Sequence, residues 1–552
     1  MSLKVGLIFR TINHLSCEQI LSQLLHRCGV RGWMFRSKPN LRLLPFSPNM
    51  EFLPRDIINH KWTETDRLEV LGVSFEVEDL MQEGFDPQVG GIVLDTLSYL
   101  RYIPPAKKNS HDVFVKTLCY LRNFSRYCRQ NSRSKARSTT FNSVERVYSL
   151  LKFMGSYQLL MSASERNEIT SNIFENVYAI YHDQEARLGG NHHLRCLLCL
   201  SLVFDLCEGD SATLRIKKRI IAKTIKELDS QFLSDGMHYE LSPGYHRLML
   251  MDILDYLELC SGINSLVQEY LLRKLPEYLN AMRFFSTKAG KIPQFNDNLP
   301  DSFPPIADIL VYAEKFGRPS IVSLSDLCES GFYSLKTSDL HVYLKAGSIG
   351  AHNQLAHAHS DNLSFELFDD EGWVCGNLPT SSYTSGPARN MTRAEPGSSA
   401  PQLKSYFQAE HWGVFRVGKC SLRSEVVFDC SVDPYKKITA SHIYTNHSGE
   451  AVVERTFKSS AEEIQISTTV KNSDDHLTHL FAASSSSVSI VNECEATIRR
   501  NNRFLVISLV GCSFEKDIFS IYSDIHKEEY KYLKLRSSSN ISYINLNFST
   551  NG

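Results

Sequence analysis

The spacing of apolar residues along the chain changes near residue 330. Between about Asp112 and Phe285, apolar side chains recur every three or four residues, as on the buried face of an α-helix. The clearest helical segments are 146–162, 170–181, 191–208, 215–233 and 245–261. Because helix follows helix with no strand between, the pattern predicts antiparallel helix pairs that close into a bundle or a toroid.

Beyond residue 330 the chain consists of short alternating runs, which predict β-strands. These runs lie at 340–346, 363–368, 424–429, 451–457, 463–470, 479–490, 504–510 and 541–548. Ser, Asn, Asp and Gly separate them, as is usual in antiparallel sheets packed as a sandwich. The predicted fold class is therefore α+β and multidomain, with helices followed by an antiparallel β-sandwich.

A chain of 552 residues is too long for one ordinary core, so we expect several domains. We place an N-terminal helical or irregular segment at 1–110, packed on the helices, a helical domain at 111–325 and the sandwich at 326–552. The basic stretch 129–140 is interpreted as a solvated connector and not as a nucleic-acid patch. Residues 384–405 are predicted to form a long loop, functional or mobile.

The amino-acid composition limits which binding partners and which cellular compartment are expected. The net charge of -1 gives no global field for an anionic polymer, so an acidic glycan would need a local basic cleft. The first apolar run is shorter than a secretory signal requires, and no stretch has the length of a membrane span. The 14 cysteines are scattered, many of them within apolar runs, and Cys196 and Cys199 are expected in a buried helix, not in a redox motif. We therefore expect a cytoplasmic protein, with the periplasm or cell envelope as the alternative.

Two histidines and a carboxylate, His357, His359 and Asp361, directly precede a predicted strand. The run 363–367 alternates apolar and polar side chains, which predicts a half-buried strand. Residues two apart in an extended segment point to the same side, so the two histidines could share one ligand or one substrate. The alternative is a loop with solvated histidines.

Further motifs occur in a fixed order, and together they resemble the heparinase II/III-like family of polysaccharide lyases. These motifs are the opening 9–15, Gly190-Asn191-His192-His193, 235–246, 293–297, 357–367, 372–383, Arg389 with Arg393, and 411–419. The resemblance covers nearly the whole chain. It implies an incomplete (α/α) toroid before the sandwich, and cleavage of a uronic-acid-containing glycan by β-elimination. The implied partner is an acidic polysaccharide or oligosaccharide; no nucleic acid and no membrane span are expected, and the oligomeric state cannot be predicted.

Such a lyase removes the C5 proton of a uronate and expels the 4-linked sugar. It therefore needs a group that binds the carboxylate, a base and an acid. The resemblance assigns these roles to Asn191, His192, Tyr245 and His357, and leaves open which residue is the base and which is the acid. Asn191 could instead be a helix N-cap, and Tyr245 could simply staple a helix start to the core.

Other residues of these motifs are candidates for substrate binding. They are Arg146, His193, Glu240, His246, Tyr383, Arg389 and Arg393. We expect Glu240 and His246 to orient their neighbours, and Arg146 or Arg389 to meet the uronate carboxylate, although isolated arginines are usually solvated. Asp297 is expected to be structural, holding a turn by Asx hydrogen bonds.

The chain departs from its relatives at a metal site and at one tyrosine. In many family members the second histidine, here His359, binds zinc together with an aspartate and a second histidine. Motif matching places Asn377 and Ser398 at those two positions, which is a poor set of zinc ligands, so we predict no bound zinc and no other cofactor. Some relatives also use a tyrosine where this chain has 390–392. A catalytically silent glycan-binding or biosynthesis-associated protein is therefore the main alternative to a lyase, and a glycoside hydrolase using Glu240 and Asp297 is the weaker one.

Overall fold

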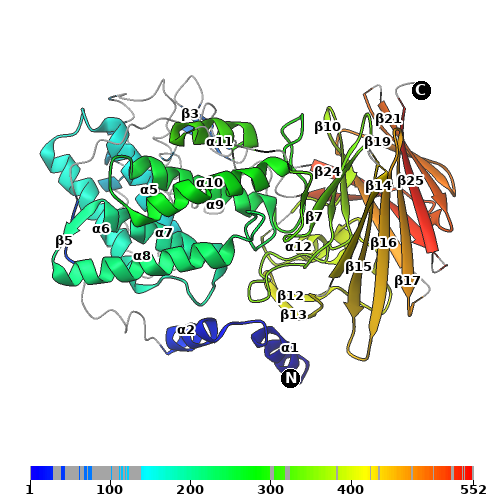
Figure 1. The fold of residues 1–552 in the computed structure, drawn as a ribbon, viewed down its shortest axis with the longest axis horizontal. Coiled ribbons are helices and arrows are strands. Elements are labelled where there is room, and N and C mark those ends of the chain that lie inside the picture. Colours follow the sequence, from blue (N-terminus) through cyan, green and yellow to red (C-terminus); the bar gives the residue numbers. More distant parts are fainter. Residues whose placement is uncertain are drawn as a thin grey trace.

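The computed structural model consists of a helical part and a β-sheet part that lie side by side (Figure 1). It describes residues 2–28, 39–43, 139–298, 304–317, 322 and 324–549, with short pieces between 61 and 122. Within the last long range, gaps fall at 381–382, 423, 433–434, 474–475, 502, 524–527, 538 and 540. Most of the basic stretch 129–140 lies outside the described residues. No helix among those described is long and apolar enough to cross a membrane.

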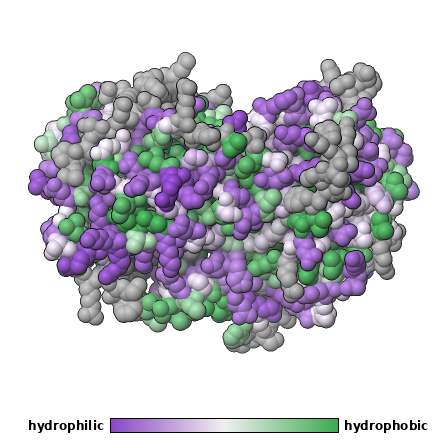
Figure 2. All heavy atoms as spheres, viewed as in Figure 1, coloured by the Kyte–Doolittle hydropathy of each residue, from purple (hydrophilic) through white to green (hydrophobic). Residues whose placement is uncertain are grey.

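Two N-terminal helices, α1 (Ser2–Ile12) and α2 (Cys17–Arg27), lie along the lower edge of the view in Figure 1. α1 packs on a hairpin of β12 (Ala409–Trp412) and β13 (Arg416–Cys420), where Arg10 donates to Glu410 at 2.7 and 2.8 Å. Phe9 and Leu21 are exposed, and hydrophobic residues reach this edge of the surface (Figure 2). Gln19 of α2 is buried, whereas the other described side chains of the two helices are half-buried or exposed.

The N-terminal segment also contains strands, which the sequence did not predict. β1 (Leu41–Leu43) pairs with β5 (Cys207–Gly209) of the helical part. β2 (Lys61–Trp62), β3 (Arg67–Val70) and β4 (Val73–Glu76) form a small antiparallel sheet.

The helical part is built from inner and outer helices in pairs. The pairs are α5 (Thr140–Tyr157) with α6 (Ala163–His182), α7 (Gly190–Asp205) with α8 (Ser211–Gln231), and α9 (Pro243–Leu259) with α10 (Leu266–Phe284). α5, α7 and α9 contact one another and are buried almost throughout, whereas their partners bury one face. This is the layered order expected of a toroid. α11 (Ile306–Ala313) follows; α10, which contains Pro276, lies in the region predicted to be helical but was not among the individual helical segments.

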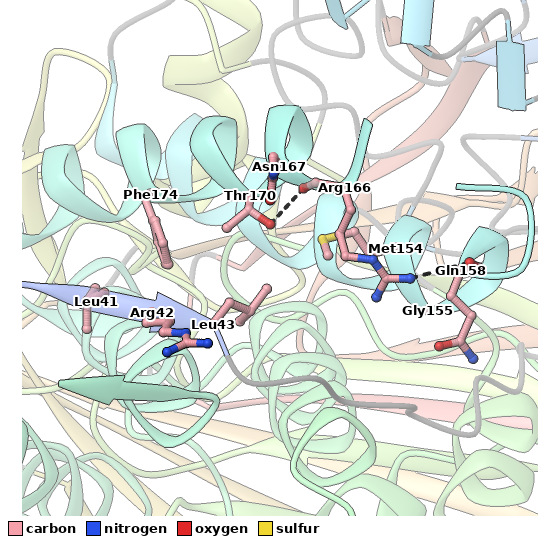
Figure 3. A pocket seen from close by; sticks show the side chains of 10 residues that line it. All are labelled: Leu41, Arg42, Leu43, Met154, Gly155, Gln158, Arg166, Asn167, Thr170 and Phe174. Atoms are coloured by element: carbon pink, nitrogen blue, oxygen red, sulfur yellow. Dashed lines mark hydrogen bonds between the residues drawn. The ribbon is translucent and has the colours of Figure 1, made fainter. Parts of the chain in front are cut away.

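A cavity of about 330 Å³ lies between β1 and the ends of α5 and α6 (Figure 3). Leu43, Met154 and Phe174 form its apolar wall, and Arg166, which donates to the Gln158 carbonyl at 3.5 Å, lies on its polar side. β1 pairs with the strand that follows α7. The cavity is therefore at the opposite end of the helical part from the start of α7.

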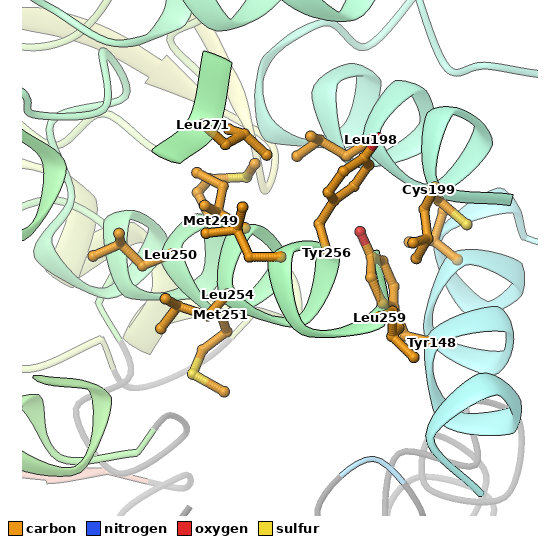
Figure 4. Packing of buried hydrophobic residues seen from close by; sticks show 14 of the residues in the cluster. Tyr148, Leu198, Cys199, Met249, Leu250, Met251, Leu254, Tyr256, Leu259 and Leu271 are labelled. Carbon is orange, nitrogen blue, oxygen red and sulfur yellow. The ribbon is translucent and has the colours of Figure 1, made fainter. Parts of the chain in front are cut away.

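The core of the helical part forms where the inner helices meet α10 (Figure 4). Tyr148, Leu198, Tyr256 and Leu271 pack there with almost no exposure. Cys199 lies in the same cluster, and burial raises the pKa of its thiol. The expectation of a buried helix in place of a redox motif is confirmed.

Buried charges also tie the inner helices together. Arg195 of α7 donates to Asp252 of α9 at 2.6 Å and pairs with Glu145 of α5. On the same face, Lys152 of α5 lies 2.8 Å from Asp255 of α9. Because each charge has an oppositely charged partner, the pairs fix how the helices pack, whereas removing one partner would leave an uncompensated buried charge.

Two antiparallel sheets form the β part, as predicted for a sandwich. The first has the order β22-β24-β18-β10-β9-β8-β7-β6, and the second β14-β15-β16-β17-β25-β21-β20-β19. The strands of the first sheet are β6 (Asp326–Leu327), β7 (Phe332–Lys336), β8 (His341–Lys345), β9 (Phe365–Asp369), β10 (Gly372–Gly376), β18 (His476–Ala482), β22 (Ser513–Phe514) and β24 (Glu528–Ser537), with β11 (Gln402–Leu403) and β23 (Phe519–Ser523) beside it. Those of the second are β14 (Ser424–Val432), β15 (Tyr435–Thr445), β16 (Glu450–Ser459), β17 (Glu463–Lys471), β19 (Ser487–Asn492), β20 (Glu495–Arg500), β21 (Arg503–Val510) and β25 (Ile541–Ser549).

Three expectations for the β part were wrong. β9 is buried on both faces, not half-buried, because Phe365 packs in the sandwich core while Phe368 joins the core of the helical part. The predicted run 479–490 spans parts of two strands, β18 and β19. The predicted loop 384–405 contains α12 (Pro387–Arg393), a short 3-10 helix and β11. The first sheet is thus enclosed between the helices and the second sheet.

Candidate active site

A buried carboxylate, Asp297, organises the junction between the two parts. It accepts a hydrogen bond from His357 Nδ1 at 2.9 Å and one from His359 Nε2 at 2.8 Å. Both terminal nitrogens of the Arg389 guanidinium also donate to it, Nη2 at 2.7 Å. Asp297 and Arg389 are fully buried, and the two histidines are nearly so. The group that the two histidines share is therefore Asp297, and the alternative of a solvated loop is wrong.

The charges of this cluster are fixed by its surroundings. Burial raises the pKa of Asp297, but the Arg389 guanidinium outweighs it and holds that pKa well below its usual range. Burial likewise lowers the pKa of Arg389, yet Asp297 brings it above the ordinary value. Burial lowers the pKa of His359. An ionised Asp297 can only accept, so His357 carries its proton on Nδ1 and turns Nε2 away from Asp297.

Tyr245 stacks against His357 at the start of α9. Its backbone N–H is capped by the Ser242 hydroxyl at 3.1 Å, which fixes the first turn of the helix. The two rings lie 3.9 Å apart between centroids at 32°. The phenol points to the Tyr383 hydroxyl at 3.4 Å, and burial raises the pKa of Tyr245. Tyr245 thus contacts the histidine at the junction, and the alternative of a simple staple is not supported.

Asn191 lies beside the same cluster, at the start of α7. The N-cap of this helix is Gly189, so the interpretation of Asn191 as an N-cap is wrong. The Asn191 amide donates to Glu240 at 2.9 and 3.1 Å, and its backbone N–H donates at 2.7 Å. Burial raises the pKa of Glu240, but His357, 3.9 Å away, and further hydrogen bonds lower it overall. The ionised Glu240 holds Asn191 next to His357.

The two histidines that follow Asn191 have different surroundings. His192 is half-buried; its Nδ1 lies 2.8 Å from Glu185, and its ring is 5.6 Å from Phe141. His193 is buried, and its Nδ1 donates to the Gln184 carbonyl at 2.7 Å. His193 lines a separate cavity, so its predicted place in the substrate site is not supported.

Four predicted substrate-binding residues already have other partners. Arg146 donates to Asn176 Oδ1 at 2.8 Å between α5 and α6, and Arg389 is paired with Asp297. His246 contacts the Tyr278 carbonyl at 2.9 Å, and burial lowers its pKa to about 3. Arg393 reaches backbone carbonyls, and burial lowers its pKa to about 10. The polar groups of these side chains are thus engaged within the protein, which does not support their predicted role in substrate binding.

The side chains at the positions that correspond to zinc ligands in relatives are each engaged in hydrogen bonds within the protein. His359 Nε2 faces Asp297, and the Asn377 side chain bonds to Ser364 at 3.1 Å and to backbone groups. The Ser398 hydroxyl bonds to the Ser360 carbonyl at 3.2 Å. In the described part of the chain, no three His, Cys, Asp or Glu side chains are arranged to hold a metal. One occupied imidazole, an amide and a hydroxyl do not fit zinc.

Two features of the site were missed at the sequence level. Asp297 was expected to hold a turn, yet it joins two histidines and an arginine. Phe415, at the tip of the β12–β13 hairpin, lies 5.9 Å from the rings of both His357 and Tyr383, and the Arg389 guanidinium lies 5.3 Å from it. Its 43% exposure is large for a phenylalanine beside a buried cluster, and only the structure reveals that proximity.

The glycoside hydrolase alternative is not supported by this geometry. Such an enzyme needs one protonated carboxylic acid, with a raised pKa, as proton donor. Glu240 and Asp297 both have pKa values below their ordinary range. Neither would hold a proton at neutral pH.

The fold and the site define a protein of the toroid-plus-sandwich class, with a tyrosine–histidine pair at the domain junction. The family model described as "Heparinase II/III N-terminus" matches residues 213–309, and "Heparinase II/III-like, C-terminal" matches 322–538. Together the two models cover more than half of the chain. The chain therefore belongs to the heparinase II/III-like family, which confirms the resemblance seen in its motifs.

Solved structures share this fold at low identity. Heparan sulfate lyase HepC from Pedobacter heparinus is 14% identical with a TM-score of 0.55, covering 99% of this chain and 93% of that one. A heparinase III gene product is 13% identical with a TM-score of 0.59 and the same coverage. Another heparinase III structure is 11% identical with a TM-score of 0.59, covering 98% and 93%. The predicted fold class is confirmed. A comparison with curated proteins finds no significant match.

Proposed function

We propose that the protein is a polysaccharide lyase that cleaves a uronic-acid-containing glycan by β-elimination. The observation that carries the proposal is the stacked pair of Tyr245 and His357, with ring centroids 3.9 Å apart. One ring offers a phenol proton and the other a basic nitrogen. This is the pairing of acid and base that elimination requires.

The surroundings of the pair favour one assignment of roles. His357 donates from Nδ1 to Asp297, so its neutral form keeps a lone pair on Nε2 and can act as the base. The raised pKa of Tyr245 keeps its phenol protonated, which suits the acid. His357 Nε2 takes the C5 proton, and the freed electron pair forms the C4–C5 double bond. The C4–O4 bond breaks as Tyr245 protonates O4, and the proton then returns from His357 to the tyrosinate.

The uronate carboxyl group would lie against Asn191 and His192. Because the Asn191 amide nitrogen donates to Glu240, its buried Oδ1 is left without a partner among the described residues. Such an acceptor favours a carboxyl group in its protonated form, and protonation would also stabilise the developing enolate. His192, half-buried at the start of α7, supplies the second polar contact.

We further propose that the substrate is a polysaccharide of the cell that makes the protein, trimmed or processed inside that cell without a metal. Cys196, Cys199, Cys207 and Cys260 are buried free thiols, which suits a reducing compartment. Phe415 and Tyr383 give the sugar ring an apolar surface, as aromatic side chains do in many polar sites.

The test is the absorbance of an unsaturated uronate while the purified protein is incubated with a panel of acidic polysaccharides. Wild type should produce the signal, and Tyr245→Phe and His357→Ala should abolish it. Tyr522→Phe is the matched control, since it removes a phenol hydroxyl from an exposed strand of the sandwich. Turnover by Tyr245→Phe at the wild-type rate would refute the assigned role.

A catalytically silent glycan-binding protein is the second candidate. It is favoured by the pairing of Arg389 with Asp297 and of the Asn191 amide with Glu240, which leaves fewer groups to neutralise a uronate. Calorimetric binding of one acidic glycan, with no unsaturated product from any member of the panel, would support this candidate.

A further inference from the structure

A cavity of about 680 Å³ lies where the N-terminal helices, the helical part and a loop of the β part meet. It is bounded by the start of α2, the start of α7, the end of α8 and the loop 348–353. Gln19 of α2 ties these walls together, because its amide donates to the Leu188 and Asn353 carbonyls at 3.2 Å. The cavity is thus built by three separate parts of the chain.

One wall carries a buried imidazole with a free nitrogen. His193 is 6% exposed, and its Nδ1 lies 2.7 Å from the Gln184 carbonyl. A carbonyl oxygen only accepts, so Nδ1 holds the proton and neutral His193 has its lone pair on Nε2. Nε2 has no partner among the described residues, and His193 lines the cavity. The nitrogen is an acceptor prepared for a donor from a ligand.

The charged side chains that line the cavity are carboxylates, whereas its Ser, Tyr, Gln and Asn side chains can both donate and accept hydrogen bonds. Glu18, Glu227 and Glu329 line it, and no Lys or Arg is among the described residues that do so. Carboxylates accept hydrogen bonds and repel anions. A metal is not favoured, because the described residues contain no group of three potential ligands in metal-binding geometry. The lining instead fits a ligand with several hydroxyl or amino donors and no negative charge.

The cavity adjoins the candidate active site without sharing its reacting groups. Tyr245 and His357 do not line it. Gly190 does, and a β-carbon there would lie 2.1 Å from Glu240 Oε1 and 2.5 Å from Gln354 Nε2. The wall between the two sites is therefore one backbone thick at Gly190, the residue before Asn191.

We propose that this cavity is a second carbohydrate site, which takes an uncharged or amino-bearing sugar ring. The inference rests on the proposed function, because the cavity would bind the non-uronate sugar of a mixed glycan. The sugar could be a unit of the substrate polymer or a separate small saccharide, and both would offer the same ring of donors to His193 and the glutamates.

The test is saturation-transfer NMR with methyl glucoside, glucosamine and glucuronate as separate probes. The first two should bind wild type, and His193→Phe should weaken them about tenfold, as expected for the loss of one hydrogen bond and of ring space. His192→Phe, the matched control on the active-site side, should leave these two probes unchanged and weaken glucuronate. Unchanged binding of methyl glucoside and glucosamine to folded His193→Phe would overturn the proposal.

A second variant keeps the proposal testable if His193→Phe does not fold. Glu227 is partly exposed, so Glu227→Lys should fold, and it should weaken glucosamine more than methyl glucoside. Equal binding of both sugars to this variant and to wild type would also overturn the site. Neither measurement needs turnover. Sugar binding without any lyase product would therefore refute the proposed lyase function but support the second sugar site. With an active enzyme, a higher KM of His193→Phe for polymer alone assigns the site to the substrate, and an unchanged KM assigns it to a separate sugar.

Discussion

Replacing Asp297 by asparagine should both destabilise the protein and slow its chemistry. The substitution keeps the shape of the side chain but removes the negative charge from a fully buried site. Arg389 would then be a buried cation without a counterion, and breaking such a pair costs about 3–5 kcal/mol. A domain of this size loses about 2–4 °C of melting temperature per kcal/mol, so we expect a fall of roughly 10 °C.

The pH dependence of this effect has a definite sign. The pKa of Asp297 is lowered in the folded state, so its stabilising contribution is present above the unfolded value of about 3.9 and is lost as the pH falls. Melting temperatures of wild type and Asp297→Asn, followed by scanning fluorimetry, should therefore converge in acid and separate towards neutral pH. A constant difference across the whole range would refute the reasoning.

The same substitution acts on His357. An asparagine can present its amide N–H to His357 Nδ1, which would favour the tautomer with the proton on Nε2 and remove the base. Turnover should fall by about two to four orders of magnitude. Adding Arg389→Gln should recover part of the lost stability, because it removes the unpaired cation. If the two substitutions destabilise additively, the ion pair does not organise the site as argued.

Three further changes test neighbouring features of the site. Phe415→Ala should raise KM, and because the ring is 43% exposed the free energy of unfolding should change by less than about 0.5 kcal/mol. An unchanged KM would exclude stacking of the sugar on Phe415. Glu410→Gln releases Arg10 of α1 from the hairpin that presents Phe415, so KM should rise with a stability loss of about 0.2–1 kcal/mol. Burial raises the pKa of Glu366, so wild type loses stability as the pH rises and the unfolded chain ionises first. Glu366→Gln should therefore melt at a higher temperature than wild type above neutral pH and at the same temperature near pH 4. Parallel pH profiles of the two melting temperatures would contradict this.

The order of helices and strands was largely predictable because each element repeats its pattern over several turns or residue pairs. The same reasoning failed where one element meets two environments. β9 alternates apolar and polar residues, yet Glu366 is buried because the helices cover the face that the pattern assigns to solvent. A sequence period records which side chains are apolar, and it cannot report what packs on the other side of a sheet.

The candidate site was predictable as a set of motifs but not as a network. His357, Tyr245 and Asn191 come from three segments that the structure brings together around Asp297 and Glu240. Asp297 bonds to partners 60 and 92 residues away, and no local pattern encodes such contacts. Its neighbours in sequence suggested a turn, whereas its partners in space make it the centre of the site.

The histidine pair after Asn191 shows why a motif cannot assign its own members. Successive residues of an α-helix point about 100° apart, so adjacent side chains at the start of α7 reach different neighbours. His192 remains beside Phe141 and Glu185, half-buried, while His193 turns to the cavity that α2 closes. The motif alone assigns both histidines to the substrate site. In the structure, His192 lies on the active-site side and His193 lines the second cavity, and the two sites meet at Gly190, which packs against the Glu240 carboxylate.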